Sequence, residues 1–494
     1  MTAPAPTSRP GRARRAIDRF IAAVARRVLG IFYRSVEVEG IDRVPRDRPL
    51  VFVANHTNSL IDGALLAGWL PAMPRFLGKS TLWRNPLLVP LLRLAAVTPV
   101  YRRQDAVDME RNAETFARCH EVLAAGGAVA LFPEGVSHAE PALMPLKTGA
   151  ARIVLGAEAE RGPLGLRVVP VGLVFDVRGR FRSRALIRIG APIDPLAAAG
   201  EGWREQGPEA VRALTGAIER GLAEVTPNFD SWEQARLIGR AAEVLERPEG
   251  DLPREESLAA GFDARRAVLL GYRDLERRHP ERVRAVAAEV EAYEALLGAA
   301  GVRDRQVAAR YPLPGVARWL VRTLAVLAGW LPLAVVGTVL NLFPYLAVTA
   351  IAGAFGRRED TRATYRVLPA LVLYPLTWAA EAWAAARLAA AAGTADWALA
   401  AALVTFAAGP LAGWAALAFH DRRRRLIAEA KAFVTLRTRR RLAAELRRRR
   451  EAMRSGIGEL VALYQHVAES PPGQAAADTR PRASGGEAAD RPAP

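Results

Sequence analysis

The sequence predicts an α/β domain, with a central sheet flanked by helices, followed by a helical extension and C-terminal transmembrane helices. Short apolar runs that end in polar or glycine-containing loops recur over residues 35–195, as buried strands do. Residues 196–312 carry Glu and Arg pairs at helical spacing, which is typical of solvent-exposed helices. Residues 313–420 hold uncharged apolar stretches long enough to cross a bilayer, which takes about 20 residues.

The N-terminal residues predict two short segments. Residues 1–15 are rich in Pro and Arg and predict a disordered basic tail. We do not expect a signal peptide, because no long uncharged apolar core with a small-residue cleavage site follows. Residues 16–34 predict an amphipathic, membrane-associated helix; its apolar positions are Ile17, Phe20, Ile21, Val24, Val28, Leu29 and Phe32. A helix packed against the following domain remains an alternative.

The first apolar run of the domain is followed by a histidine and an aspartate. Leu50 to Ala54 predicts a buried strand, and His56 lies in the loop that leaves it. Ligands of open α/β sheets bind beyond the carboxyl ends of strands, so His56 is placed for chemistry. A neutral imidazole can take a proton from an alcohol, and the carboxylate of Asp62, in the first turn of the next helix, can orient it. Ser59 to Asp62 also fits a capping box, which gives the carboxylate a structural role instead.

Another tight turn follows a second predicted strand. The apolar run that starts at Gly127 breaks at Phe132-Pro-Glu-Gly135. Pro133 removes a backbone donor and Gly135 frees the backbone, so Glu134 lies on a turn at a strand's carboxyl end. Two more buried strands are predicted, at residues 166–175 and 185–190.

Four blocks in this order resemble the glycerolipid acyltransferase superfamily over residues 35–195. They are a His–Asp block at 56–62, an Arg-bearing block with Arg102 and Arg103, a Phe-Pro-Glu-Gly block at 132–135 and a Val-Pro-Val block at 169–171. The commonest form of the first block has four residues between His and Asp, whereas this chain has five. With Phe-Pro-Glu-Gly-Val-Ser-His, this spacing is more similar to the glycerol-3-phosphate/dihydroxyacetone-phosphate acyltransferase branch than to the lysophosphatidate enzymes.

The resemblance implies acyl transfer from a thioester to a hydroxyl of glycerol-3-phosphate or a related phosphorylated glycerol, early in phospholipid synthesis. His56 is then the general base and Asp62 orients it. Glu134 and Gly135 match the acceptor-binding turn. Arg102 matches the Arg-bearing block and Arg103 is its neighbouring candidate for binding the acceptor's phosphate.

Lysine usage adds two candidates for acceptor binding. The chain has 69 basic residues, of which only three are lysines. Two of these, Lys79 and Lys147, lie within the region that the blocks span, in Gly78-Lys-Ser-Thr81 and in Met144-Pro-Leu-Lys-Thr-Gly149. A compact ammonium differs from a planar guanidinium, so a site can require it where arginine is otherwise preferred.

The composition also bears on cofactors and partners. We expect no cofactor and no metal, with acyl-CoA or acyl carrier protein as the co-substrate. The net charge of +18 is concentrated at both ends and beside apolar segments, which favours anionic membrane lipids as partners and not nucleic acid. The single cysteine, Cys119, has no nucleophile motif around it and is expected to pack in the core.

Loop charge suggests how the membrane region is threaded. Residues 323–355 are uncharged and contain Pro332 and Pro344, and 367–386 and 397–419 are further spans. A hairpin at 323–355 places both the four arginines of 357–366 and the basic helix 421–468 on the catalytic side, as the positive-inside rule requires. We therefore expect a multi-pass protein of the inner (cytoplasmic) membrane with its catalytic domain in the cytoplasm and a disordered tail at 469–494.

Three other functions stay open at this stage. The same chemistry on a lysophospholipid, 1-acylglycerol-3-phosphate, is the nearest alternative. A non-catalytic lipid-binding module has no need of the His56–Asp62 pair. A transporter needs polar residues inside the spans, where Glu381 is the clear acidic residue.

Overall fold

A computed structural model describes residues 11–84, 88–101, 112–247, 257–309 and 311–469. The chain divides into two compact units. The first comprises Met1–Ala235, Glu255–Phe262 and Tyr311–Ala430, and the second comprises Arg236–Arg254, Asp263–Arg310 and Lys431–Pro494. Residues 1–10 and 470–494, which hold most of the two expected tails, lie outside the described residues.

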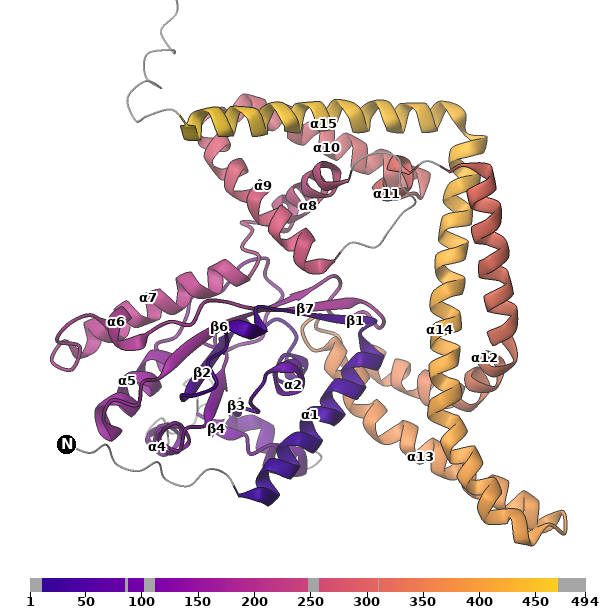
Figure 1. Cartoon of the computed structure of the whole chain (residues 1–494), viewed down its shortest axis with the longest axis horizontal. Helices are drawn as coiled ribbons and strands as arrows, with labels where there is room; N and C mark the ends of the chain where they lie inside the picture. Colours follow the sequence, from indigo (N-terminus) through magenta and orange to yellow (C-terminus); the bar gives the residue numbers. More distant parts are fainter. Residues whose placement is uncertain (1–10, 85–87, 102–111, 248–256, 310, 470–494) are drawn as a thin grey trace, which may run out of the picture. The chain divides into compact units, whose positions relative to one another are not determined.

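The first unit is built on a seven-stranded sheet of order β1-β7-β6-β2-β5-β3-β4 (Figure 1). The strands are β1 (Ser35–Glu39), β2 (Leu50–Ala54), β3 (Arg75–Lys79), β4 (Thr98–Val100), β5 (Ala128–Leu131), β6 (Arg167–Phe175) and β7 (Arg184–Ile189). Neighbouring strands are parallel except β6 and β7, which are antiparallel. The four strands predicted from apolar runs are confirmed as β2, β5, β6 and β7. Because β2, β5 and β3 are parallel, the loops that follow them leave the same edge of the sheet.

Helices cover both faces of this sheet (Figure 1). They are α1 (Arg12–Phe32), α2 (Leu60–Trp69), α3 (Val89–Leu94), α4 (Asn112–Ala124), α5 (Gly149–Arg161), α6 (Pro195–Ala199) and α7 (Gly207–Val225), with the short 3-10 helices η1 (Ile41–Arg43) and η2 (Ser80–Arg84). Strand β2 shows why both faces are covered. Phe52 belongs to the hydrophobic cluster under α1 and α2, whereas Val51 and Val53 belong to the cluster under α4, α5 and α7. Alternate side chains of a strand point to opposite faces, so an apolar run needs a core on each side.

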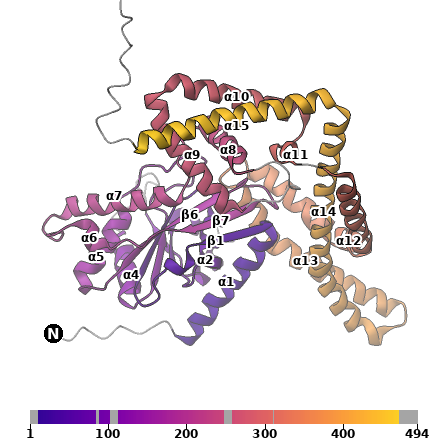
Figure 2. The same cartoon turned by 45° about the horizontal axis from the view of Figure 1, so that its top comes forward.

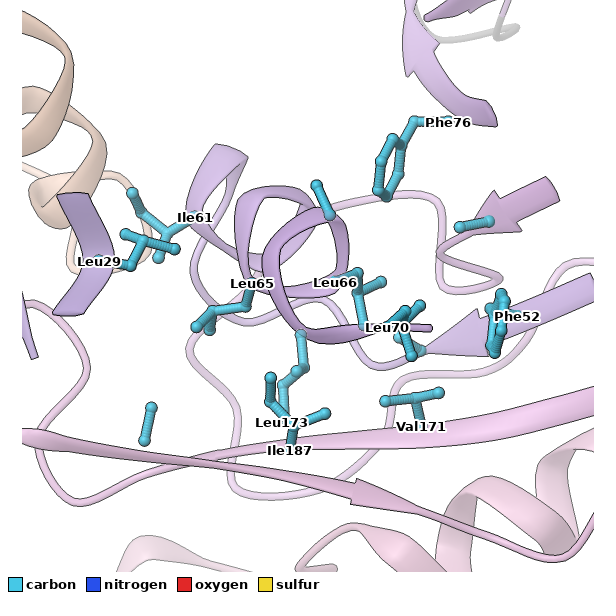
Figure 3. Packing of buried hydrophobic residues seen from close by; sticks show 14 of the residues in the cluster. Leu29, Phe52, Ile61, Leu65, Leu66, Leu70, Phe76, Val171, Leu173 and Ile187 are labelled. Carbon is cyan, nitrogen blue, oxygen red and sulfur yellow. The ribbon is translucent and has the colours of Figure 1, made fainter. Parts of the chain in front are cut away.

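Helix α2 follows the loop of His56 and holds Asp62 in its first turn. Its leucines anchor it to the sheet. Leu65 and Leu66 are 0% exposed and lie toward Leu173 and Ile187 of the sheet (Figure 3). Fully burying a leucine stabilises the fold by about 1.5–3 kcal/mol. The start of α2 is therefore fixed relative to the end of β2.

Helix α1 packs against α2, which is the alternative that its sequence pattern left open. Leu29 and Phe32 lie in the core, and Asp18 accepts two hydrogen bonds from Arg75, at 2.8 and 2.6 Å. Phe20 remains 62% exposed, and contact of this face with a membrane stays a prediction. The helix begins at Arg12, so the end of the expected N-terminal tail is helical.

The second unit is helical. It takes in most of α8 (Trp232–Glu246) and α9 (Leu258–Arg278), together with α10 (Pro280–Ala300), α11 (Asp304–Ala308) and α15 (Arg440–Glu469). Helices α10 and α15 lie side by side (Figures 1 and 2). The hydroxyl of Tyr293 donates to buried Asp304, which also accepts from Arg450.

Two boundaries of the expected helical segments are wrong. The extension was expected from residue 196, but α7 packs on the sheet, where the carbonyl of Val225 leaves no room for a side chain at Gly172. The segment 421–468 was expected as one helix, but it is divided between the end of α14 (Ala398–Thr438) and α15. The chain turns there because Leu446 and its apolar neighbours on α15 are buried in the core of the second unit.

Three helices of the described residues are long and apolar enough to cross a membrane. They are α12 (Leu313–Phe355), α13 (Arg362–Ala391) and α14, which the 3-10 helix η5 (Ala395–Trp397) precedes. The hairpin expected at 323–355 is wrong, because α12 continues through Pro332 and Pro344. Each proline removes one backbone donor, which a helix packed against others tolerates. Asn341 of α12 supports this packing: its amide donates to Gly409 O of α14, and its carbonyl accepts from Trp378 of α13.

Candidate active site

His56 and Asp62 meet at the carboxyl end of β2. The Nδ1 atom of His56 lies 3.0 Å from Oδ2 of Asp62. The Asp62 side chain is 0% exposed, whereas that of His56 is 20% exposed. The ring of Phe132 stacks on the imidazole with centroids 4.1 Å apart. Because Nδ1 faces the carboxylate, Nε2 is the ring nitrogen that can meet a substrate.

The Asp62 carboxylate is held for contact with the imidazole and not for helix capping. Its Oδ2 also accepts from the backbone N–H of Asn58, at 2.7 Å. Ser59 makes no side-chain capping bond, and its own N–H donates to Ser137 Oγ at 3.1 Å. The capping-box alternative is therefore wrong. Burial raises the pKa of Asp62, while hydrogen bonding to His56 opposes that shift.

Glu134 joins the loops after β2 and β5 to each other. Its Oε1 accepts from the backbone N–H of His56 at 2.7 Å, and Oε2 accepts from the N–H of Met144 at 3.0 Å. Oε2 also contacts Nε2 of His138. Glu134 is 2% exposed, so both oxygens are occupied inside the protein. The carboxylate joins the two loops through these contacts, and a role in acceptor binding stays a prediction.

Gly135 and Lys147 lie against each other at the same edge of the sheet. Gly135 has a φ of 73°, a left-handed value that favours glycine. A Cβ at this position would lie 2.6 Å from Nζ of Lys147, so the ammonium covers the glycine. The backbone of Lys147 is fixed by its N–H, which donates to Pro133 O at 2.8 Å. Lys147 is exposed and places a positive charge beside the turn.

Three further candidates for acceptor binding remain. Lys79 is exposed at the end of β3, next to β5 in the sheet. Arg102 and Arg103 lie outside the described residues, just after β4 in the sequence. Cys119 is 3% exposed and burial raises its pKa to about 12, which fits a packed core residue. Among the residues with described positions, no group of three or more His, Cys, Asp or Glu is arranged to hold a metal.

Sequence reasoning missed the polar side chains that hold the His56 loop. The Asn55 amide donates to Leu173 O at 3.0 Å and its carbonyl accepts from Leu173 N at 2.7 Å, which ties β2 to β6. Asn58 donates to the hydroxyl of Tyr33, at 2.8 Å. Two asparagines within four residues at a strand end were the available signal. Tyr33 had none, because it lies 25 residues away in the sequence.

Parts of this chain are similar to known families and proteins. Residues 35–174 match the family described as Acyltransferase, and residues 253–465 match the family described as Glycerol-3-phosphate acyltransferase 2 C-terminal domain. A glycerol-3-phosphate O-acyltransferase 2 from Saccharomyces cerevisiae is 33% identical over 40% of this chain and 26% of its own length. A 1-acyl-sn-glycerol-3-phosphate acyltransferase from Brassica napus is 27% identical over 33% of this chain and 44% of its own.

Solved structures match as well. The 1-acyl-sn-glycerophosphate acyltransferase from Thermotoga maritima is 25% identical, with a TM-score of 0.33, and the match covers 43% of this chain and 81% of that one. The chain spans about a quarter of the length of the first yeast relative.

Proposed function

We propose that this chain, which carries an acyltransferase domain at residues 35–174 and a glycerol-3-phosphate acyltransferase 2 C-terminal domain at residues 253–465, acylates glycerol-3-phosphate. The acyl group comes from a thioester, which is either acyl-CoA or acyl-loaded acyl carrier protein. The reaction is an early step of phospholipid synthesis. The observation that carries the proposal is the 3.0 Å contact between His56 Nδ1 and Asp62 Oδ2, with a partly exposed imidazole beyond it.

The dyad can perform the transfer in two steps. His56 Nε2 takes the proton of the acceptor hydroxyl while its oxygen attacks the thioester carbonyl carbon. Asp62 stabilises the imidazolium that forms. The tetrahedral intermediate then expels the thiolate, the C–S bond breaks, and His56 returns the proton to sulfur. General base catalysis of this kind contributes about a hundred- to ten-thousandfold in rate.

Positive charge beside the dyad would bind the acceptor's phosphate. Lys147 covers Gly135 on the turn that Glu134 joins to the His56 loop. Lys79 is the last residue of β3, and Arg102 and Arg103 come two and three residues after β4 in the sequence. Guanidinium groups can bind phosphate with two parallel hydrogen bonds, and an ammonium acts as a point charge. Glu134 serves this site by holding its loops.

Three apolar helices among the described residues indicate a membrane protein, and we infer that its catalytic domain faces the cytoplasm. Arg366, near the start of α13, donates to Gly179 O at 2.7 Å, and Asp421 of α14 pairs with Arg182 at 2.6 Å. These contacts put one end of the α13–α14 pair at the catalytic domain. Four arginines, 422–425, follow directly, and such clusters stay on the cytoplasmic side. Acyl thioesters and glycerol-3-phosphate are cytoplasmic metabolites.

The test offers acyl-CoA or acyl-loaded acyl carrier protein, with glycerol-3-phosphate, dihydroxyacetone phosphate or 1-acylglycerol-3-phosphate, to membranes containing the full chain. We expect acylation of glycerol-3-phosphate, with turnover reduced by about two to four orders of magnitude in His56→Ala. His279→Ala, at the start of α10, is the matched control and should keep its turnover.

Two other results bear on the proposal. Transfer to 1-acylglycerol-3-phosphate alone would establish the second candidate function, which the Brassica napus relative favours. A folded protein that consumes no acyl thioester with any of these acceptors would rule out both functions.

A further inference from the structure

Two buried polar side chains, Asn58 and Tyr33, lie behind the Asp62 carboxylate. Both are 0% exposed. The side-chain amide of Asn58 donates to the Tyr33 hydroxyl at 2.8 Å and to Arg178 O at 3.3 Å. The backbone N–H of the same asparagine donates to Asp62 Oδ2 at 2.7 Å. Asn58 therefore binds the Asp62 carboxylate through its backbone, and the Tyr33 hydroxyl and the Arg178 carbonyl through its side chain.

The position is unusual for polar groups. The Tyr33 ring packs in the core, with its centroid 4.9 Å from Phe32 and 5.8 Å from Phe175, where a phenylalanine would fit as well. Burying a hydroxyl or an amide costs about 1–3 kcal/mol unless it is hydrogen-bonded. Burial, and then the charge of Asp62, raise the pKa of Tyr33 well above its ordinary value, so its hydroxyl stays protonated. The Tyr33 hydroxyl and the Asn58 amide are both buried at this position, which indicates that they do more than fill the core.

The backbone of the loop shows what must be held. Five residues separate His56 from Asp62, and the next residue after Asn58, Ser59, has a φ of 53°. A residue other than glycine in this region carries strain of about 1–3 kcal/mol and persists only where its surroundings enforce it. Ser59 is fixed on one side by Ser137 Oγ. Asn58 fixes the other side, through Tyr33 and Arg178 O.

We propose that Asn58 and Tyr33 are positioning residues for acyl transfer. The Tyr33 hydroxyl holds the Asn58 side chain, and the Asn58 backbone N–H then holds Asp62 Oδ2 against His56 Nδ1. The N-terminal helix α1, which Tyr33 directly follows, thereby sets the geometry of the dyad. This inference rests on the proposed function of His56 and Asp62.

The experiment uses the full chain in membranes and compares Tyr33→Phe and Asn58→Ala with the unsubstituted protein. Tyr293→Phe is the matched control, because it also removes a buried tyrosine hydroxyl, one that donates to Asp304 in the second unit. We expect Tyr33→Phe to lower kcat about tenfold, less than the hundredfold that a 1 Å misplacement can cause. The KM values for both substrates should stay within about twofold and the Tm should match that of Tyr293→Phe, because hydroxyl removal leaves the packing and the substrate contacts in place.

A double variant separates positioning from a general loss of order. If Tyr33 acts through Asp62, Tyr33→Phe should lower kcat in the native background and have little further effect in an Asp62→Asn background. An unchanged kcat in Tyr33→Phe and Asn58→Ala, or an equal loss in both backgrounds, would overturn the inference and leave the proposed function intact. Absence of transfer by the unsubstituted protein would overturn both.

Discussion

Replacing Asp62 with asparagine separates the proposed catalytic role of this side chain from its effect on stability. The carboxylate is fully buried and accepts hydrogen bonds from the Asn58 N–H and from His56. Asparagine has nearly the same shape and can still accept from Asn58. It carries no charge, however, and cannot stabilise an imidazolium. Turnover should fall by about a hundred- to ten-thousandfold, the range that base catalysis contributes.

The stability of the variant should move in the opposite direction. Burial raises the pKa of Asp62 in the folded protein above its ordinary value of 3.8. The folded state therefore binds more protons than the unfolded state between these two values, and stability decreases as the pH rises through that window. Above the window the ionised carboxylate destabilises the fold by a constant amount. Asp62→Asn lacks this penalty, so its Tm at pH 7 should equal or exceed that of the native protein.

The measurement is thermal unfolding of both proteins at pH 7 and at a pH below 3.8, together with turnover at pH 7. We expect the difference in Tm to shrink at the lower pH, where the native carboxyl is protonated in both states. A Tm at pH 7 well below the native value, with turnover kept, would refute the reasoning and restore a structural role for the carboxylate. A large loss of turnover without loss of stability is the outcome that the geometry predicts.

Three further predictions concern other residues. Glu134→Gln should destabilise the fold by about 1.5–3 kcal/mol, because the new NH2 group then faces a backbone N–H donor. Denaturant unfolding measures this loss, and an unchanged free energy of unfolding would contradict the prediction. Lys147→Ala should raise the KM for the phosphorylated acceptor and leave the KM for the thioester unchanged. Lys431→Ala, in α14, is the matched control. A normal acceptor KM in Lys147→Ala would show that Lys147 does not bind the phosphate. Ala389→Cys should be labelled from outside intact cells and Arg358→Cys only after permeabilisation, and the reverse pattern would refute a cytoplasmic catalytic domain.

The sequence allowed the strands and the dyad to be predicted, because both depend on local patterns. Apolar runs of five to nine residues correspond to β2 and β6, and His56 lies just beyond the first of them. The capping box at Ser59 was misleading for a physical reason. The motif describes residue types at a helix start, but Ser137, 78 positions away, takes the Ser59 N–H instead. Only the fold brings these two residues together.

The expected hairpin at 323–355 fails for a related reason. Proline frequency and loop charge are properties of the chain alone, whereas the continuity of α12 depends on what surrounds it. Asn341 binds α13 and α14 at once, and such contacts compensate for the donors that proline removes. With the hairpin excluded, the orientation is inferred from contacts: Arg366 and Asp421 hold both charged segments at the catalytic domain.

The catalytic domain and the start of α13 share one hydrophobic core. Ala363 is 0% exposed and Val367 is 8% exposed, and both belong to the cluster that contains Leu29 and Leu65. These contacts join residues about 300 positions apart, so no local sequence pattern could have predicted them. Arg366 donates a hydrogen bond to Gly179 O in the turn between β6 and β7. The preceding residue of that turn, Arg178, supplies the carbonyl that accepts from Asn58. The start of α13 therefore helps to define the loop that presents His56, because it shares a core with the sheet and holds the turn that Asn58 binds.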